Sequence, residues 1–140
     1  MPGHSWVVVD TDVWSLLFGA KHREHAAAAR WREQLVGRSV VVAMQTRAEV
    51  LTWLALGKLG QDRTERISSQ LERTRTVPVT EDVVRVYADL TATCMNEGLG
   101  LHDKRHTGDR WVAATAMAID APLLAADHIY RGTPGLRLLT

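Results

Sequence analysis

The sequence predicts an α/β fold: a single domain with a mostly parallel central sheet and helices on both faces. Short β-branched runs alternate with longer helical segments along the chain, which is the pattern of a parallel sheet with crossover helices. The length of 140 residues suits one domain, spanning 1–140. The hydrophobic content of 46% is enough for a chain of this size to bury a core without disulfides.

The first half of the chain contains two predicted strands and two predicted helices. Trp6–Val9 is a continuous apolar run, which predicts a strand buried on both faces. His22–Leu35 has helical composition, and Gly37 follows it as a helix-ending glycine would. Val40–Val42 predicts a second buried strand, and Gln45–Leu56 predicts a further helix.

The second half continues the alternation of helices and strands. A polar helix is expected over Gln61–Arg75, a strand over Val77–Val79, and a helix that Thr80 caps and that runs toward Asn96. The remaining expected elements are a polar loop over Leu101–Gly108, a helix over Asp109–Ile119, a strand over Pro122–Ala126 and a further strand over Leu136–Leu139. Ligands of such sheets bind at the carboxyl ends of the strands, so the site is expected there.

Charge and cysteine content limit the setting and the partners. The formal net charge of +1 neither requires nor excludes nucleic acid, so any basic surface must be local. Cys94 is the single cysteine, which rules out an intramolecular disulfide and favours a reduced, cytoplasmic location. No stretch approaches the roughly 20 apolar residues of a membrane span, so we expect no association with the membrane.

Four acidic residues are candidates for the chemistry. Asp10 and Asp127 directly follow predicted strands, although aspartate there is also common in turns and helix caps. Glu49 lies in an apolar helix with no basic residue three or four positions away, so a buried carboxylate there needs another partner. Asp109 opens an alanine-rich helix, where a helix cap is the alternative role.

Together these acids predict a cation site. Carboxylates gathered at one sheet edge repel and raise one another's pKa, and a hard cation removes that repulsion. Mg²⁺ prefers carboxylate and water oxygens. The chain has no HExxH or CxxC sequence, so a zinc site is not expected.

The pattern resembles the PIN domain of VapC-type toxins, which belong to the VapBC toxin–antitoxin systems. The matching segments are Val8–Asp12, Thr46–Val50, Asp109–Ala116 and Ala126–Asp127, in the family's order and spacing. The third of these is the most specific. The resemblance implies a Mg²⁺-dependent endoribonuclease, with Mn²⁺ as a substitute, that cuts RNA and so inhibits translation. It also implies a cognate VapB-type antitoxin and a homodimer.

The resemblance assigns roles to individual residues. Asp10 and Asp109 are expected as the main metal ligands, with Glu49 and Asp127 as further catalytic acids that bind metal or orient a water. Thr11 falls on a frequent hydroxyl position beside the first acid. Two positions depart from the family pattern: Gly108 replaces a common Asn, and Asp12 replaces a common Asn or Ser. They leave open whether Asp12 takes part in the metal site.

Basic residues near the third acid are candidates for RNA contact. Lys104, Arg105 and Arg110 flank Asp109, and incoming phosphates need cations to offset the repulsion from the carboxylates. A solvated surface loop is the alternative role for such a basic stretch.

Two other functions fit parts of the sequence. Asp10 and Asp12 after a strand also resemble the start of haloacid-dehalogenase phosphatases, which need a lysine after a later strand. The lysines at Lys21, Lys58 and Lys104 end no predicted strand. A catalytically silent PIN-like module that binds RNA or a partner is the non-enzyme alternative, and the presence of all four acids argues against it.

Overall fold

A four-stranded parallel sheet forms the centre of the molecule in the computed structural model, which describes residues 5–19 and 26–139. The strands are β1 (Trp6–Val9), β2 (Ser39–Ala43), β3 (Arg75–Val77) and β4 (Leu123–Leu124), in the spatial order β3-β2-β1-β4. The helices are α1 (Thr11–Trp14), α2 (Ala28–Leu35), α3 (Met44–Leu56), α4 (Gln61–Arg73), α5 (Glu81–Asn96) and α6 (Thr107–Ala118). The predicted α/β class is confirmed.

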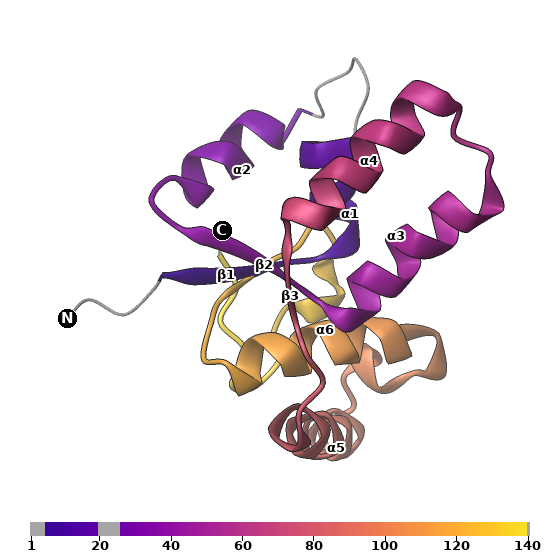
Figure 1. Ribbon diagram of the computed structural model, residues 1–140. Helices are drawn as coiled ribbons and strands as arrows, with labels where there is room; N and C mark the ends of the chain where they lie inside the picture. Colours follow the sequence, from indigo (N-terminus) through magenta and orange to yellow (C-terminus); the bar gives the residue numbers. More distant parts are fainter. Residues whose placement is uncertain (1–4, 20–25, 140) are drawn as a thin grey trace.

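The sheet separates two hydrophobic cores. Side chains alternate along β1, so Val8 packs with α5 and α6, whereas Val7 and Val9 pack on the opposite face with α1 to α4. All three valines are fully buried, which confirms that this run is covered on both faces. Figure 1 shows the same layers, with α5 and α6 below the sheet and α2 and α4 above it.

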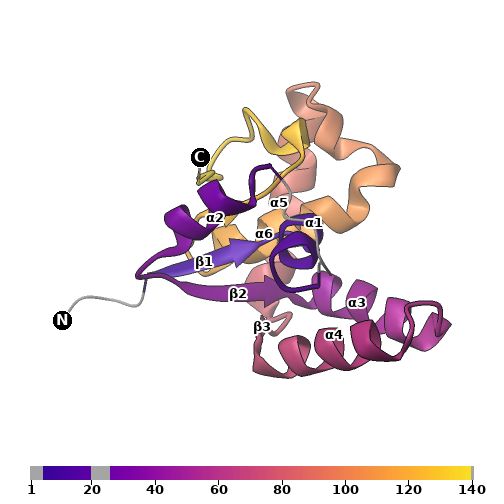
Figure 2. The ribbon, with the colours of Figure 1, turned by 90° about the horizontal axis from the view of Figure 1, so that it is seen from above.

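The carboxyl ends of the two central strands meet at one edge. β1 and β2 pair in parallel register, with Val7 opposite Val40 and Val8 opposite Val41. In Figure 2 both arrows point the same way, toward α1 and α3. Because each strand continues directly into a helix, the first residues of α1 and α3 lie side by side at this edge.

Several elements differ from their predicted bounds. The strand predicted at Val77–Val79 lies two residues earlier, because Pro78 has no N–H to donate to a sheet. Only Leu123–Leu124 of the predicted fourth strand pairs, and the Leu136–Leu139 segment contributes a single bridge, between Leu123 and Leu138. The helix predicted from His22 begins at Ala28 in the described residues, and its first positions lie outside them.

Short helical turns were missed at three places. A π-helical turn, η1 (Ser15–Gly19), continues α1 directly. The predicted polar loop before α6 is folded into two 3₁₀ turns, η2 (Gly100–His102) and η3 (Lys104–His106). A further 3₁₀ turn, η4 (His128–Tyr130), follows β4. Among the described residues, no helix combines the length and the apolar character needed to cross a membrane.

Candidate active site

Asp10 is held in place at the carboxyl end of β1. Its backbone N–H donates to the Leu124 carbonyl at 3.1 Å, which continues the pairing of β1 with β4. Its carboxylate Oδ1 accepts a 2.9 Å hydrogen bond from the Val13 N–H, so Asp10 is also the N-cap of α1. Only 5% of the residue is exposed. The sheet and the helix together therefore fix the direction of this carboxylate.

Burial makes the charge of Asp10 unfavourable. The pKa of Asp10 is raised from 3.8 to about 7, chiefly by desolvation and further by repulsion from Asp12 and Asp109. Hydrogen bonds from the N–H groups of Val13 and Ala126 oppose it without cancelling it. A bound cation would remove this penalty.

The acids converge on a small cavity of about 80 Å³, here called the acidic pocket. Its lining consists of Asp10, Thr11, Asp12, Glu49, Asp109, Val112 and Tyr130. Partial burial raises the pKa of Asp12, and the charges of Glu49, Asp109 and Asp127 raise it further. Residues from α1, α3 and α6 thus present their carboxylates to one space, as the strand-end argument predicts.

Both oxygens of the Asp109 carboxylate have partners. His106 Nδ1 lies 2.8 Å from Oδ2, and the Tyr130 hydroxyl donates to Oδ1 at 3.1 Å. Burial, followed by the nearby acids, raises the pKa of Tyr130 far above its usual value, so this hydroxyl keeps its proton and remains a donor. Sequence reasoning missed both partners. The spacing of His106 three residues before Asp109 was the only local signal, whereas Tyr130 comes from a distant turn.

Glu49 is oriented by its own helix. Its Oε1 accepts a 3.0 Å hydrogen bond from the Gln45 amide, one turn earlier in α3. A Cβ at Gly108 would lie 3.0 Å from that amide nitrogen, so the lack of a side chain at Gly108 lets α6 start close to Gln45. The hydroxyl of Thr11 donates to that of the fully buried Thr46 at 3.0 Å, which ties α1 to α3 beside the acids.

Asp127 does not line the acidic pocket. Its Oδ1 accepts from the Ile129 N–H at 2.9 Å, so it caps η4, and the residue is exposed. Its charge nevertheless acts on Asp12 and Tyr130, since it raises the pKa of both. Asp127 therefore stands at the margin of the acidic pocket, not inside it.

The three predicted RNA contacts separate into two groups. Lys104 and Arg105 are exposed on η3, close in sequence to Asp109. Arg110 is only 5% exposed, and its Nη1 donates to the carbonyls of Leu101 and Asp103 at 2.7 and 2.8 Å. The buried guanidinium of Arg110 is thus held by the protein itself, which argues against the predicted contact of this residue with RNA.

The acidic pocket suits a hard cation that keeps several of its waters better than a cation that protein ligands enclose completely. Within residues 5–19 and 26–139, no three His, Cys, Asp or Glu side chains are grouped so that they could hold a metal ion by themselves, so waters would have to complete the shell of a cation bound here. Mg²⁺ usually keeps several waters and takes one or two carboxylates from the protein. The raised pKa of buried Asp10 and the carboxylate lining match that mode of binding.

Known structures share this fold. The chain aligns over 95% of its length with a chain of the VapBC2 complex from Rickettsia felis bound to a promoter DNA fragment (TM-score 0.75, 15% identity, 96% of that chain covered). The alignment with FitAcB from Neisseria gonorrhoeae (TM-score 0.74, 20% identity) covers 96% of this chain and 96% of that chain. The alignment with VapBC-5 from Mycobacterium tuberculosis (TM-score 0.67, 20% identity) covers 96% of this chain and 98% of that chain.

The sequence itself identifies the family. Comparison with curated proteins finds no match. The model of the PIN domain, in contrast, matches residues 7–136, which include all of β1 but Trp6, the whole lining of the acidic pocket and most of the segment after β4. This match removes the haloacid-dehalogenase alternative. The chain belongs to the PIN-domain family.

Proposed function

We propose that this protein is the toxin of a type II toxin–antitoxin pair and acts as a Mg²⁺-dependent endoribonuclease, with Mn²⁺ as a substitute. The observation that carries the proposal is the acidic pocket, in which a buried aspartate with a pKa of about 7 faces further carboxylates at the sheet edge. The PIN fold and its likeness to chains of VapBC complexes support the toxin assignment.

Asp10 and Asp109 are the proposed main ligands, with Glu49 as a further ligand or a holder of a water. Asp127, at the margin, is the proposed group for a second ion or for orienting a water. When bound, the cation would neutralise the acids, lower the pKa of a water and stabilise charge on the scissile phosphate. Thr11 and Asp12 have supporting roles.

The chain's own contacts orient these groups. Tyr130 and His106 fix the plane of the Asp109 carboxylate, and Gln45 restrains Glu49. Such restraint matters because a carboxylate that already points at the reaction centre needs little reorganisation when charge develops there. Lys104 and Arg105, exposed on η3, are the proposed contacts for RNA phosphates.

Metal-dependent cleavage of a labelled RNA tests the enzyme assignment. We expect cleavage with Mg²⁺, its loss on chelation, and a decrease of several orders of magnitude in Asp10→Asn and in Asp109→Asn. Asp89→Asn is the matched control, because Asp89 is an exposed acid on α5 outside the acidic pocket. Wild-type rates in a folded Asp10→Asn or Asp109→Asn variant would show that the site is assigned wrongly.

Expression in cells tests the toxin assignment separately. Growth arrest that depends on Asp10, and that is relieved when the neighbouring reading frame is expressed alongside, is the expected result. Light scattering of the purified chain tests the proposed homodimer. We also propose a cytoplasmic location, because the proposed substrate is RNA. Arrest that persists although a soluble complex with the neighbouring protein forms would contradict the antitoxin role.

A second candidate remains for a chain of this family. A catalytically silent PIN module would bind RNA or a partner without cutting. The raised pKa of Asp10 argues against this candidate, because a silent module has no reason to bury an acid among other acids. Binding of RNA without cleavage in Mg²⁺ and in Mn²⁺ would favour it.

A further inference from the structure

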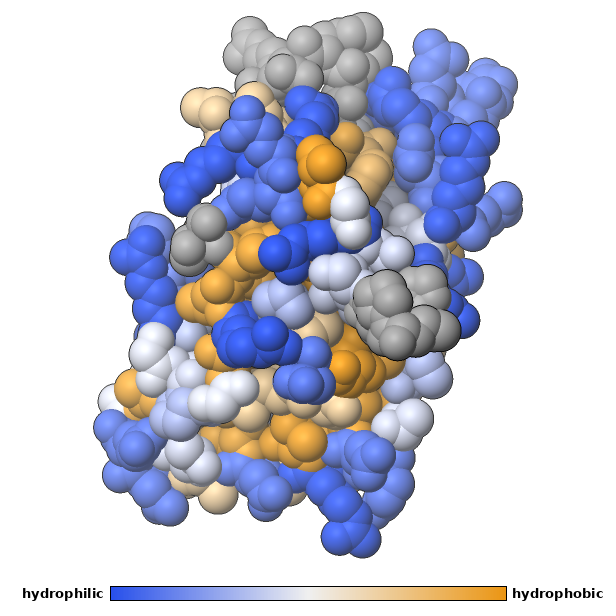
Figure 3. Space-filling view, turned by 90° about the vertical axis from the view of Figure 1, so that its left-hand side faces the viewer, coloured by the Kyte–Doolittle hydropathy of each residue, from blue (hydrophilic) through white to orange (hydrophobic). Residues whose placement is uncertain are grey.

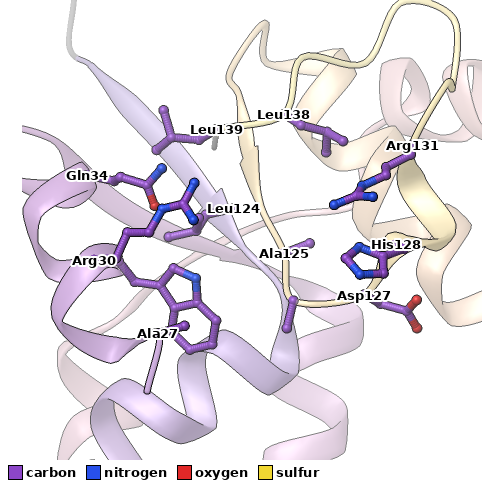
Figure 4. Close-up of a pocket in the computed structure, with 12 residues that line it drawn as sticks. Ala27, Arg30, Gln34, Leu124, Ala125, Asp127, His128, Arg131, Leu138 and Leu139 are labelled. Carbon is purple, nitrogen blue, oxygen red and sulfur yellow. The ribbon is translucent and has the colours of Figure 1, made fainter. Parts of the chain in front are cut away.

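A second cavity lies beside the acidic pocket. It has a volume of about 300 Å³ and lies between α2 and the segment from β4 to η4. We call it the basic pocket; Arg30, Gln34, Leu124, His128, Arg131 and Leu139 are among its lining residues. Figure 4 shows the guanidinium groups of Arg30 and Arg131 reaching toward its centre from opposite sides.

The two arginine side chains of the basic pocket are free to bind a ligand. Within the part of the chain that the structure describes, the guanidinium groups of Arg30 and Arg131 form no ion pair or hydrogen bond. Both residues are exposed, and His128 adds an exposed imidazole. Asp127 is the one acid of the lining, and its carboxylate points away from the cavity in Figure 4. The charge of the basic pocket therefore suits an anion.

Gln34 adds a donor that the protein leaves unused. Its amide nitrogen Nε2 is buried and finds no hydrogen-bond partner in the described structure. A buried N–H without an acceptor is destabilising. Because Gln34 lines the same cavity as the two arginines, a ligand with acceptor oxygens would satisfy this amide.

The floor of the basic pocket is apolar. Its apolar lining includes Leu124, Ala125, Leu138 and Leu139, and in Figure 4 Leu124 and Ala125 lie between the two arginines. The side of the molecule that carries α2 and the C-terminal segment likewise mixes hydrophobic with strongly hydrophilic residues (Figure 3). A ligand that combines an anion with a flat apolar surface matches both features, and a nucleotide is such a ligand.

The two pockets share a wall. Asp10 accepts a hydrogen bond from the Ala126 N–H, and Ala126 lines the basic pocket. Within the short turn η4, His128 faces the basic pocket whereas Tyr130 lines the acidic one. A single strand held in one pocket can therefore continue into the other across this turn.

We propose that the basic pocket is a nucleotide subsite, in which Arg30 and Arg131 bind a backbone phosphate of the RNA strand next to the cleaved bond. Gln34 donates to an oxygen of the same nucleotide, and the apolar floor receives its sugar or base. This inference rests on the proposed ribonuclease function, and it identifies the substrate as single-stranded RNA that extends beyond the scissile phosphate.

Fluorescence anisotropy with a labelled single-stranded RNA of about 12 nucleotides tests the subsite. Binding is measured in Ca²⁺, which slows cleavage, across a salt series. Arg30→Ala with Arg131→Ala should weaken binding roughly tenfold or more at low salt, because each arginine loses a charged hydrogen bond. The log–log salt slope should become shallower by about 0.7 for each lost phosphate contact.

The control removes two charges elsewhere. Arg38→Ala with Arg73→Ala takes away exposed arginines that do not line the basic pocket, and it should leave the slope near that of the wild type. Gln34→Leu gives a second readout. It should keep or raise the melting temperature, because the unsatisfied amide disappears, yet weaken RNA binding. A purely structural Gln34 would leave RNA binding unchanged.

The outcomes separate the subsite from the enzyme assignment. If the wild type cleaves RNA but the Arg30/Arg131 variant binds like its control, the subsite is wrong and the proposed function stands. If the wild type neither binds nor cleaves RNA, both are wrong. If the variant binds RNA normally but loses capture of the protein from the neighbouring reading frame, the pocket serves a protein partner and the nucleotide subsite is overturned.

Discussion

The buried charge of Asp10 predicts that removing it stabilises the metal-free protein. The pKa of Asp10 rises from 3.8 to about 7, a difference of about three pH units. At 1.36 kcal/mol per unit, ionisation of this carboxyl in the folded state costs about 4 kcal/mol. Asp10 is 5% exposed, so solvent screens little of that energy.

The sign of the pH dependence follows from linkage. Between about pH 4 and pH 7 the folded state holds a proton on Asp10 that the unfolded state has released, so stability falls as pH rises through this window. Below about pH 4 both states are protonated and the effect vanishes. Above about pH 7 both are ionised and the full cost remains.

The perturbation is Asp10→Asn. Asparagine keeps an acceptor for the Val13 N–H but leaves the Ala126 N–H with a poorer partner, which costs roughly 1 to 3 kcal/mol. The variant should therefore be about 1 to 3 kcal/mol more stable than the wild type at pH 8, and no more stable at pH 4. For a domain of this size that gain corresponds to roughly 4 to 10 °C in Tm.

Urea unfolding followed by circular dichroism, with chelator present, measures this difference. The control Asp89→Asn, in an exposed position on α5, should show a pH profile parallel to that of the wild type. An Asp10→Asn variant that is less stable than the wild type at every pH, with parallel profiles, would refute the argument from desolvation.

Three further predictions use the same site. Mg²⁺ or Mn²⁺ should raise the Tm of the wild type through binding to the native state, and by less in Asp10→Asn; equal shifts would contradict binding at Asp10. Tyr130→Phe should lower the cleavage rate and weaken metal binding in calorimetry while the fold persists, because Asp109 Oδ1 loses its donor; unchanged values would make Tyr130 a packing residue only. Lys104→Ala with Arg105→Ala should weaken RNA binding and flatten its salt dependence but leave metal affinity unchanged, and superimposable curves would exclude this turn from the RNA site.

The sequence predicted the positions of those acidic residues that the ends of the strands determine. Asp10 follows a run of valines that can only be a buried strand, so its place at the sheet edge was predictable. Glu49 and Asp109 lie on predicted helices near that edge, and both line the acidic pocket. The α/β class and the helices α3 and α5 follow from equally local patterns.

Side-chain direction was not predictable in the same way. Arg110 lies in a basic stretch, yet it turns inward because backbone carbonyls of the preceding turns lie within its reach. Tyr130 reaches Asp109 from a turn 21 residues later, and only the packing of η4 brings the two together. Asp127 caps its own turn, a role that competes locally with any role in the acidic pocket.

The inward-facing Arg110 has a consequence for the surface above it. Its guanidinium holds the carbonyls of Leu101 and Asp103, while Asp103 in turn accepts from the Arg105 N–H at 3.0 Å. The turn that carries Lys104 and Arg105 is thus ordered before any ligand arrives, so little backbone entropy is lost when one binds. Lysine at position 110 would keep the charge but not the planar fork that grips two carbonyls. Such a variant would have the same net charge as the wild type, yet the turn that carries Lys104 and Arg105 would be less ordered when the ligand binds.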